Sequence, residues 1–426
     1  MLKKTGFLFS ILLFVLSMVH AQSDNSPYSR YGLGDLNPAE NIISRGMGGV
    51  SAGYFDFQSV NSMNAATYSK LRLTTFDFGM NLNSRTIQSF NPVKKFTSVN
   101  PQISYIQIGI PLAKNWGMGF GLKPLTRINY DIERRSDLGF DSVHTNFKGD
   151  GGGNQVFWGT GYSIGNFSAG INVNYLFGSK NYHTYTTILP DSLNPYHYRS
   201  NHTNSVNYGG LSAAWGAQYM FKTGKETYLQ LGAFGNLKST INANKDHIVE
   251  TFSETAQGNF RIDSIYENID QKGKMIYPST LGAGFMFRKS DKWMFGADYV
   301  TSKWSQYEIF NEKDLVQDSW KLNVGGQVTP NSFNPSTYWG RVSYRAGFSI
   351  GEDYVAATGK MNTFSFSVGA GFPMRRANYS NQVSVINTAL EFGSRGNEDN
   401  LIKENYFRLN VGLTLSDVWF IKRKYD

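Results

Sequence analysis

The sequence predicts an all-β fold, a 14-stranded antiparallel transmembrane β-barrel with an N-terminal hatch segment inside the lumen. The first observation is alternation, since residues 116–122 read Trp-Gly-Met-Gly-Phe-Gly-Leu. Successive side chains of a strand point to opposite faces, so this strand has one apolar face and one bare face. The second observation is length, because such segments recur at about ten residues, enough for a tilted strand to cross a bilayer. The third is that short and long connections take turns along the chain.

The N-terminus indicates export. Lys3 and Lys4 precede an apolar run of about 13 residues, too short to span a membrane comfortably. The small residue Ala21 then fits a signal-peptidase site, which predicts a signal peptide over residues 1–21 and cleavage before Gln22. The chain has no cysteine, so disulfides and thiolate metal sites are excluded. The expected location is the outer membrane after this cleavage.

Composition favours the same class of protein. The 44 Gly, 31 Phe, 25 Tyr and 8 Trp suit strands with small lumen-facing residues and aromatic belts at the membrane interfaces. A mean hydropathy of −0.36 is compatible with a membrane barrel, because half of every barrel strand faces a polar interior. The net charge of +9 suits contact with anionic lipid head groups, while nucleic acid is not expected as a partner of an exported protein.

Counting alternating segments between turn signals gives the 14 strands. They are expected at 71–83, 102–112, 115–126, 153–164, 166–178, 206–221, 227–240, 277–288, 292–306, 317–329, 338–350, 361–372, 382–393 and 404–416. An even number places both termini on the periplasmic side. The connections on that side are short, and they are 113–114, 165–166, 222–226, 289–291, 330–337 and 373–382. The expected outer loops are long and polar, and they include 84–101, 127–152, 179–205 and 241–276.

The predicted domain organisation has four parts. The signal peptide is followed by a segment without sustained alternation, residues 22–70, which we call the hatch. The barrel covers 71–416, and a periplasmic tail covers 417–426. A barrel of this size has a lumen wide enough to need filling, so we expect the hatch to lie inside it as a plug.

These features resemble the FadL-type outer-membrane transporters. The resemblance rests on the signal peptide, the strand number, the glycine-rich hatch sequence Arg45-Gly46-Met47-Gly48-Gly49, and the element Asn64-Ala65-Ala66 before the first strand. It covers nearly the whole mature chain. The family usually has Asn-Pro-Ala where this chain has Asn-Ala-Ala. Arg45, Gly46, Gly48, Gly49 and Asn64 are the hatch residues that the resemblance singles out.

The resemblance implies passive uptake of hydrophobic compounds, such as long-chain fatty acids or aromatic hydrocarbons, through a barrel closed by the hatch. It also implies a kinked third strand that opens a lateral path into the bilayer. Pro124 lies at the outer end of that strand, and proline, which cannot donate to a sheet ladder, is able to mark such a break. Gly117, Gly119, Gly121 and Pro124 are therefore the candidate lateral opening. The alternative is that Pro124 only ends the strand and the glycines make room for the hatch.

Ionisable residues at lumen-facing positions are the candidate ligand-binding residues. Strand parity places Asp77, Asp298 and Glu391 on this face, together with Lys123, Arg341, Arg345 and Arg408. Pairing with each other or with the hatch is one interpretation, because buried charges need partners. The other is a site for a carboxylate head group. Arg408 is expected to be neutralised by Asp77, which leaves Arg341 or Arg345 to bind the ligand, with Lys123 as a further candidate.

An enzyme is not expected, because all five histidines of the mature chain fall in predicted outer loops, away from any Ser or Thr of the barrel wall. We therefore assign no catalytic residues, no metal site and no cofactor. The favoured hypothesis is an uptake channel. The alternative is a FadL-like barrel that serves a protein secretion or cell-surface attachment system, with secreted proteins as partners. The other expected partners are outer-membrane lipid and lipopolysaccharide, hydrophobic small molecules and the barrel assembly machinery.

Overall fold

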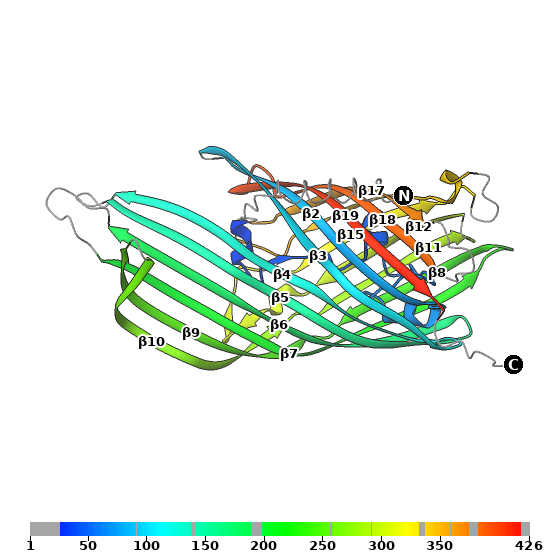
Figure 1. The fold of residues 1–426 in the computed structure, drawn as a ribbon, viewed down its shortest axis with the longest axis horizontal. Helices are drawn as coiled ribbons and strands as arrows, with labels where there is room; N and C mark the ends of the chain where they lie inside the picture. Colours follow the sequence, from blue (N-terminus) through cyan, green and yellow to red (C-terminus); the bar gives the residue numbers. More distant parts are fainter. Residues whose placement is uncertain are drawn as a thin grey trace, which may run out of the picture.

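The computed structural model describes residues 26–90, 92–137, 142–188, 198–255, 258–290, 292–331, 337–357, 359–374 and 382–418. The predicted signal peptide and most of the C-terminal tail lie outside these residues. Fourteen antiparallel strands form a closed barrel, in which the last strand pairs with the first along its whole length, from Ile402↔Ser89 to Asp417↔Thr74. Figure 1 shows this closure, with the red strand beside the blue one. The predicted fold class and strand number are confirmed.

The barrel strands follow one another around the wall, apart from the insertions described below. They are β2 (Thr74–Phe90), β3 (Val93–Ala113), β4 (Trp116–Asp137), β5 (Ser142–Ile164), β6 (Phe167–Ile188), β7 (Arg199–Lys222), β8 (Thr227–Asn236), β11 (Thr280–Lys289), β12 (Trp293–Ser302), β15 (Ser319–Val328), β16 (Ser343–Glu352), β17 (Asn362–Pro373), β18 (Val383–Arg395) and β19 (Ile402–Asp417). Shorter elements between them are η3 (Trp304–Gln306), β13 (Glu308–Ile309), β14 (Glu312–Lys313) and η4 (Trp339–Arg341).

The prediction of long outer loops is wrong for much of their length, because these residues form strands. Residues 84–90 and 93–101 continue β2 and β3, and the ladder between β4 and β5 continues to Asp137↔Ser142. Beyond the apolar belt the inward residues of these strands, such as Arg85, Ser98 and Asn100, are polar although they are buried. Because the outward residues are largely polar as well, the contrast between the two faces is lost and the sequence reads as a loop. In Figure 1 these extensions lie on the left, beyond the shorter strands β8, β11, β12 and β15 to β17.

The predicted loop 241–276 is also a hairpin, formed by β9 (Ser239–Thr255) and β10 (Gly258–Tyr277). β9 pairs with the outer part of β7, from Arg199↔Phe252 to Gly209↔Asn242, above the point where β8 ends. One half of the wall, from β4 to β10, therefore extends farther outward than the other half, toward the left in Figure 1.

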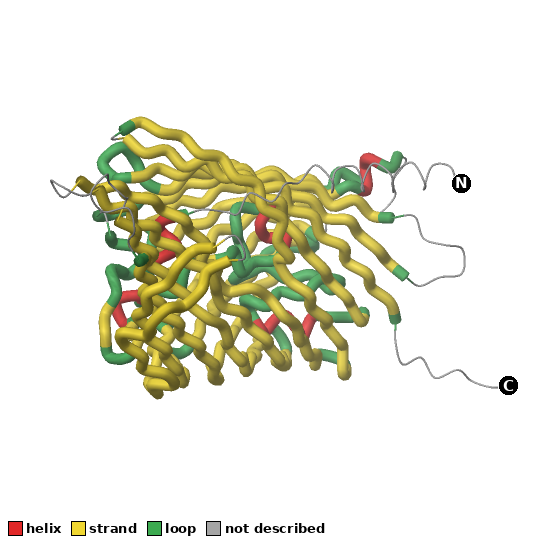
Figure 2. Tube along the Cα trace, turned by 60° about the vertical axis from the view of Figure 1, so that its left-hand side comes forward, coloured by secondary structure: helices red, strands yellow, loops and turns green. Residues whose placement is uncertain are grey.

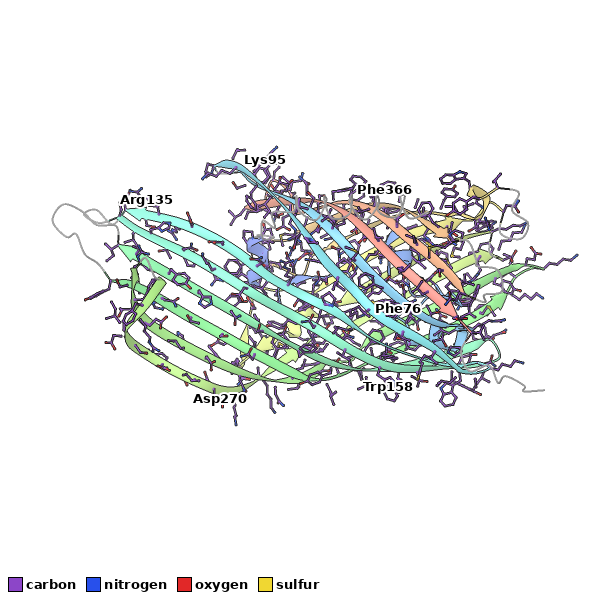
Figure 3. All side chains as sticks on the ribbon, in the orientation of Figure 1. Phe76, Lys95, Arg135, Trp158, Asp270 and Phe366 are labelled. Atoms are coloured by element: carbon purple, nitrogen blue, oxygen red, sulfur yellow. The ribbon has the colours of Figure 1, made fainter. Side chains whose placement is uncertain are left out.

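Alternation along the strands separates the lipid from the lumen. Phe76, Trp158 and Phe366 are exposed on the outer face of the barrel, whereas Ser367, next to Phe366, is buried inside. In Figure 3 these three aromatic residues lie on the barrel, while the charged residues Lys95 and Arg135 lie near the tips of two hairpins and Asp270 lies along β10, at a register shift of the long β9–β10 hairpin. The sequence thus gives the barrel an apolar belt between two polar ends, as an outer-membrane protein requires.

Phe366→Arg is expected to prevent stable insertion of the barrel, whereas Phe366→Leu is tolerated. An arginine near the bilayer midplane costs about 2 to 4 kcal/mol in such barrels, and leucine keeps the apolar contact. The measurement is the fraction of protein that refolds into lipid vesicles and resists denaturation by detergent before heating. Equal refolding of the two variants would contradict the assignment of this face to the lipid.

The hatch lies inside the lumen, as predicted. Its elements are η1 (Pro27–Arg30), β1 (Asp35–Leu36), α2 (Ile42–Gly46) and η2 (Ala65–Lys70). Figure 2 shows these short helical turns, in red, enclosed by the yellow wall. Their side chains are mostly buried, including Met47, Val50 and Tyr68. Within the described residues, no helix has the length and apolar character needed to cross a membrane.

Candidate functional site

Lumen-facing glycines form a narrow waist that holds the hatch. An added Cβ at Gly117 or Gly161 would come closer than 3.0 Å to the backbone of η2, at Tyr68 and Ala65. The same holds around the wall for Gly170, Gly216, Gly232, Gly325 and Gly347, each of which faces a backbone or Asn64 side-chain atom of the hatch. Glycine is required because only a residue without Cβ permits such a close approach. The hatch therefore packs against the wall backbone to backbone.

Polar contacts fix the hatch in this waist. The carboxylate of Asp298 accepts hydrogen bonds from Ser51 N at 2.5 Å and Ala52 N at 2.7 Å. Asn64 caps η2 by accepting from Ala66 N and donates to Ala52 O at 2.8 Å. Asp298 Oδ2 and the Asn64 side chain are thus both hydrogen-bonded to the hatch backbone, which fixes the hatch in one position.

The predicted hatch residues all lie at this contact. Arg45 donates to Asn410 Oδ1 at 2.8 Å and to the hatch carbonyl Pro38 O at 2.6 Å. Gly48, with φ of 68°, lies against the backbone of Phe348, and its N–H donates to Ser367 Oγ at 3.0 Å. Gly46 and Gly49 meet Arg345 and Asn323 in the same layer. Asn64 performs the capping described above.

The candidate lateral opening divides into two parts. Gly117 and Gly119 face Tyr68 of the hatch, and Gly121 lies against Gln107 of β3, so these glycines make room inside the barrel. Pro124 instead lies where the wall splits. β3 and β4 pair only from Ile106↔Leu122 to Ala113↔Trp116, and in the described residues no pairing between them continues outward. A bulge at Leu125, between Pro124 and Thr126, bends β4 just beyond this point.

A cavity of about 680 Å³ lies at the split. Ile103 of β3, Pro124 and Arg127 of β4, and Asn37 of the hatch line it, with Phe177 and Tyr208 on its far side. On the lipid face, the apolar positions of β4 end at Pro124 and those of β6 end at Phe177. The cavity therefore lies where the apolar belt gives way to the outer head-group region.

A second cavity, of about 330 Å³, lies within the lumen against the hatch. Its lining is amphipathic. Phe234, Trp304 and Tyr406 contribute apolar surface, and the charged lining residues include Glu40, Lys123, Arg395, Glu404 and Arg408. A ligand with both an apolar body and a polar head matches such a lining better than a pure hydrocarbon does.

Lys123 is buried at the side of this cavity. Its Nζ donates to Ser62 Oγ at 3.3 Å and lies 5.8 Å from the centre of the Phe157 ring. In the described part of the chain, no carboxylate lies within ion-pair distance of this amine. Glu40, which lines the same cavity, is the carboxylate whose charge acts on this amine, but the two form no ion pair. A buried ammonium without an ion pair is costly, so the site is suited to an anion supplied by a ligand.

The other predicted cations have different surroundings. Arg345 is buried beneath α2 and donates to Gln327 Oε1 at 2.7 Å and Asn387 Oδ1 at 3.0 Å, away from the lumen cavity. Arg341 is expected on the same strand, but it lies in η4, outside β16 and exposed at the end with the short turns. The lumen-facing placement of Arg341 is therefore wrong, because a 3-10 turn interrupts the alternation before the strand begins.

The predicted pair of Arg408 with Asp77 is also wrong. Strand β19 does close against β2, but the register sets Arg408 opposite Asn83 and sets Thr414 opposite Asp77. Arg408 forms an ion pair with Glu391 at 3.0 Å, and Asp77 accepts from Thr414 Oγ1 at 3.1 Å. Strand parity identifies the right face of the sheet, while the partner depends on the register between strands.

Sequence reasoning misses the largest charged cluster of the lumen, which we call the clamp. It consists of Asp35 from β1, Arg85 from β2, Asp353, Arg395 from β18 and Glu404 from β19. Arg395 bonds Asp35 at 2.7 Å and Asp353 at 2.9 Å, and Arg85 bonds Asp35 as well. Arg85 continues the parity of Asn81 and Asn83, so extending strand β2 into the predicted loop 84–101 is the signal that identifies it.

A closed barrel of 14 strands, an apolar outer belt and a hatch packed into the lumen define a plugged outer-membrane barrel protein. Over residues 1–426 the chain matches the family model described as BamG, and the protein belongs to the BamG family. No protein of curated function matches its sequence.

Solved structures with this fold include the following three proteins. The toluene transporter TodX of Pseudomonas putida has a TM-score of 0.57 at 16% identity, covering 89% of this chain and 99% of that one. The monoaromatic hydrocarbon channel CymD has a TM-score of 0.54 at 15% identity, covering 91% and 99%. A FadL homologue of Pseudomonas aeruginosa has a TM-score of 0.54 at 12% identity, covering 92% and 100%. These likenesses confirm the FadL-type fold that the sequence predicts.

Proposed function

We propose that this protein is a non-enzymatic outer-membrane channel for hydrophobic compounds that carry an anionic head group, of which long-chain fatty acids are the simplest. The observation that carries the proposal is the buried Lys123 amine, which faces an amphipathic lumen cavity and has no carboxylate partner in the described residues. The solved structures with the same fold include channels for hydrophobic compounds, which supports uptake as the activity.

The split between β3 and β4 supports the proposed route. Lys123 on β4 is next to Pro124, which lines the cavity at the split. A ligand held by its head group at Lys123 thus lies beside the break in the wall. Lateral passage into the bilayer requires no movement of the hatch out of its glycine waist.

Lys123→Met is expected to lower fatty-acid uptake about tenfold and to leave uptake of toluene unchanged. Methionine keeps the apolar stem but removes the charge that attracts a carboxylate, worth about 1.5 to 3 kcal/mol in a charge-assisted hydrogen bond. Stability is expected to be unchanged or higher, because the substitution breaks no ion pair. The measurement is uptake of radiolabelled fatty acid and toluene by cells that express each variant as their uptake protein.

Lys321→Met is the matched control, because Lys321 borders the same cavity and is exposed. Its uptake of both compounds should equal that of the native chain. If Lys123→Met slowed both compounds equally, or slowed neither, the assignment of Lys123 as the head-group site would be overturned.

A second candidate function is that of a subunit in a protein secretion, surface attachment or barrel assembly system. The β9–β10 hairpin favours it, because this hairpin stands outside the bilayer and exposes apolar side chains that a conduit does not need. They are Phe260, Ile262, Ile265, Tyr266 and Ile269. Replacing residues 242–274 by a short turn tests this role. Loss of a co-purifying secreted or assembly protein would support the partner role, and an absence of fatty-acid uptake by the native chain as well would favour that role over transport.

A further inference from the structure

The cavity of about 680 Å³ extends from the split over the outer face of β4 to β7, and we call this part of it the hollow. One row of directly opposed residues crosses the hollow, with Arg127 on β4, Gly152 on β5, Ser179 on β6 and Asn207 on β7. Opposed residues of neighbouring strands lie on the same face of a sheet. The two middle residues have little or no side chain, so the longer side chains of Arg127 and Asn207 border a floor of main chain.

The backbone of β5 fixes the floor of the hollow. Gly152 has a φ of 139°, which residues with a side chain rarely adopt. An added Cβ at this position would also come closer than 3.0 Å to Thr126 O. Position 152 therefore cannot carry a side chain that fills the hollow, and the space is a constant feature of the wall.

The hollow lies at the boundary between the apolar belt and the outer head-group region. On its membrane side, Leu122, Val156 and Tyr175 are opposed to one another and are 41, 44 and 49% exposed. On its outer side, Asp150 and Asn181 form a hydrogen bond on the same face of the sheet. A molecule that fills the hollow therefore meets hydrocarbon at one end and a polar surface at the other.

The side chains of the hollow suit a phosphorylated sugar. The guanidinium of Arg127 matches phosphate, which it binds through paired charge-assisted hydrogen bonds. The amides of Asn154 and Asn207 and the hydroxyl of Ser179 offer donors and acceptors to sugar hydroxyls. None of the described residues that line the cavity is acidic, so no lining carboxylate repels a phosphate.

The position of the hollow selects the outer leaflet. Strands β4 to β7 continue outward from it into the half of the wall that extends farther from the bilayer (Figure 1). The outer leaflet of an outer membrane contains glycolipids whose acyl chains are attached to phosphorylated glucosamine. Such a lipid has its hydrocarbon and its anionic sugar in the order that the lining requires.

We propose that the hollow binds one molecule of lipid A, the glycolipid anchor of lipopolysaccharide. The glucosamine phosphate lies at Arg127, the sugar hydroxyls lie at Asn154, Ser179 and Asn207, and the first carbons of an acyl chain lie against Phe177. The lipid occupies the side of the cavity formed by β4 to β7, whereas Gln102 and Ile103 of β3 form the side at the split. Lipid binding here is independent of the proposed uptake and is measured without a transported compound.

Titration with fluorescent lipid A tests the site. In detergent micelles the protein should bind one lipid A molecule per barrel, and binding should saturate. Arg127→Gln should weaken it about tenfold, which equals about 1.4 kcal/mol and is close to the contribution of one charge-assisted hydrogen bond. Asn207→Leu, at an exposed position, should weaken binding as well. If Arg127→Gln prevents folding, Asn207→Leu decides alone, and an unchanged affinity in that variant would overturn the proposal.

Lys272→Gln is the matched control. Lys272 belongs to the same row of the sheet, because Asn207 is opposite Asn244 and Asn244 is opposite Lys272. It is an exposed cation outside the hollow, so its variant should bind lipid A like the native chain. Equal weakening by Arg127→Gln and Lys272→Gln would mean that binding follows net charge, and weakening by neither would mean that it occurs elsewhere. Either result would overturn the site.

Two further lipids distinguish the parts of the head group. Lipid A without phosphate should bind the native protein about tenfold more weakly, and this difference should disappear in the Arg127→Gln protein. Phosphatidylglycerol, which has a phosphate but no sugar ring, should also bind more weakly than lipid A. Equal binding of phosphatidylglycerol would indicate a general phospholipid site and would reject lipid A as the occupant. Equal binding of the lipid without phosphate would reject Arg127 as the phosphate ligand.

Discussion

Gly347→Ala is expected to unseat the hatch while the barrel remains folded. An added Cβ at Gly347 would lie closer than 3.0 Å to the backbone of Met47 and Gly48, a separation that real Cβ atoms do not show. The atoms of Met47 and Gly48 that this Cβ would meet belong to the main chain, which packs against β15 and β16, so a change of side-chain rotamer cannot make room for it. Forcing extra volume into a packed core costs about 1 to 3 kcal/mol, and here the strain falls on the hatch. The ladders of β16 with β15 and β17 do not involve the missing Cβ.

Trypsin cleavage and conductance measure this effect. Arg45 is buried in the native protein, so trypsin should leave its peptide bond intact, whereas the Gly347→Ala protein should be cut there within the same digestion time. Single-channel recordings in a planar bilayer should show open events that the native protein lacks. Gly224→Ala is the control, because a Cβ at Gly224 meets only Thr227 at ordinary contact distance. Protection of Arg45 in the variant would show that the waist tolerates a side chain.

Arg395→Met is expected to destabilise the protein by about 3 to 5 kcal/mol, because it removes the ion-pair partner of Asp353 and leaves Arg85 alone to neutralise the buried carboxylates of Asp35 and Glu404. Arg395 is the central residue of the clamp, with ion pairs to Asp35, Asp353 and Glu404 and with its guanidinium 5.2 Å from the centre of the Tyr28 ring. The free energy of unfolding in urea, measured in lipid vesicles, gives the magnitude.

Arg261→Met is the matched control, because Arg261 also pairs with more than one carboxylate, here Glu250 and Glu267, but is exposed on the β9–β10 hairpin. Exposed ion pairs contribute less than about 1 kcal/mol, so this variant should unfold nearly like the native chain. Similar losses for both variants would show that burial does not set the strength of the clamp.

Within the bilayer, strand positions follow from the sequence because lipid and lumen impose opposite demands on neighbouring residues. The strand predicted over residues 166–178 lies within β6 except for its first residue, and in it Phe167 and Ile171 face outward and Asn172 is buried inside. The prediction ends too early because polar residues occupy both faces farther along β6, with Lys180 buried inside and Asn181 and His183 on the outer face, so the period of two disappears. A loop and a solvated strand then look alike.

For the residues of the candidate site, the sequence predicts which face of the barrel wall each side chain lies on, but it does not predict which residue each side chain contacts. Parity alone places Lys123, Arg345 and Arg408 in the lumen. The actual partner of Arg408 depends on the register of β19 against β2, and a shift of six residues separates Asn83 from Asp77, about 20 Å along the strand. The clamp is beyond reach for a related reason, since its members include Asp35 and Glu404, from opposite ends of the chain.

This placement of the clamp has a consequence for the order of assembly. The segment that leaves the ribosome early is secured by Arg395 and Glu404 of the last two strands. Contacts so distant along the chain form late, because closing a long loop is entropically costly until the strands between are in place. The hatch is therefore synthesised first, but its contacts with the clamp form last. Before the last two strands join the barrel, the hatch lacks its ion pairs with Arg395 and its hydrogen bond with Glu404. We expect these contacts to form when the wall closes.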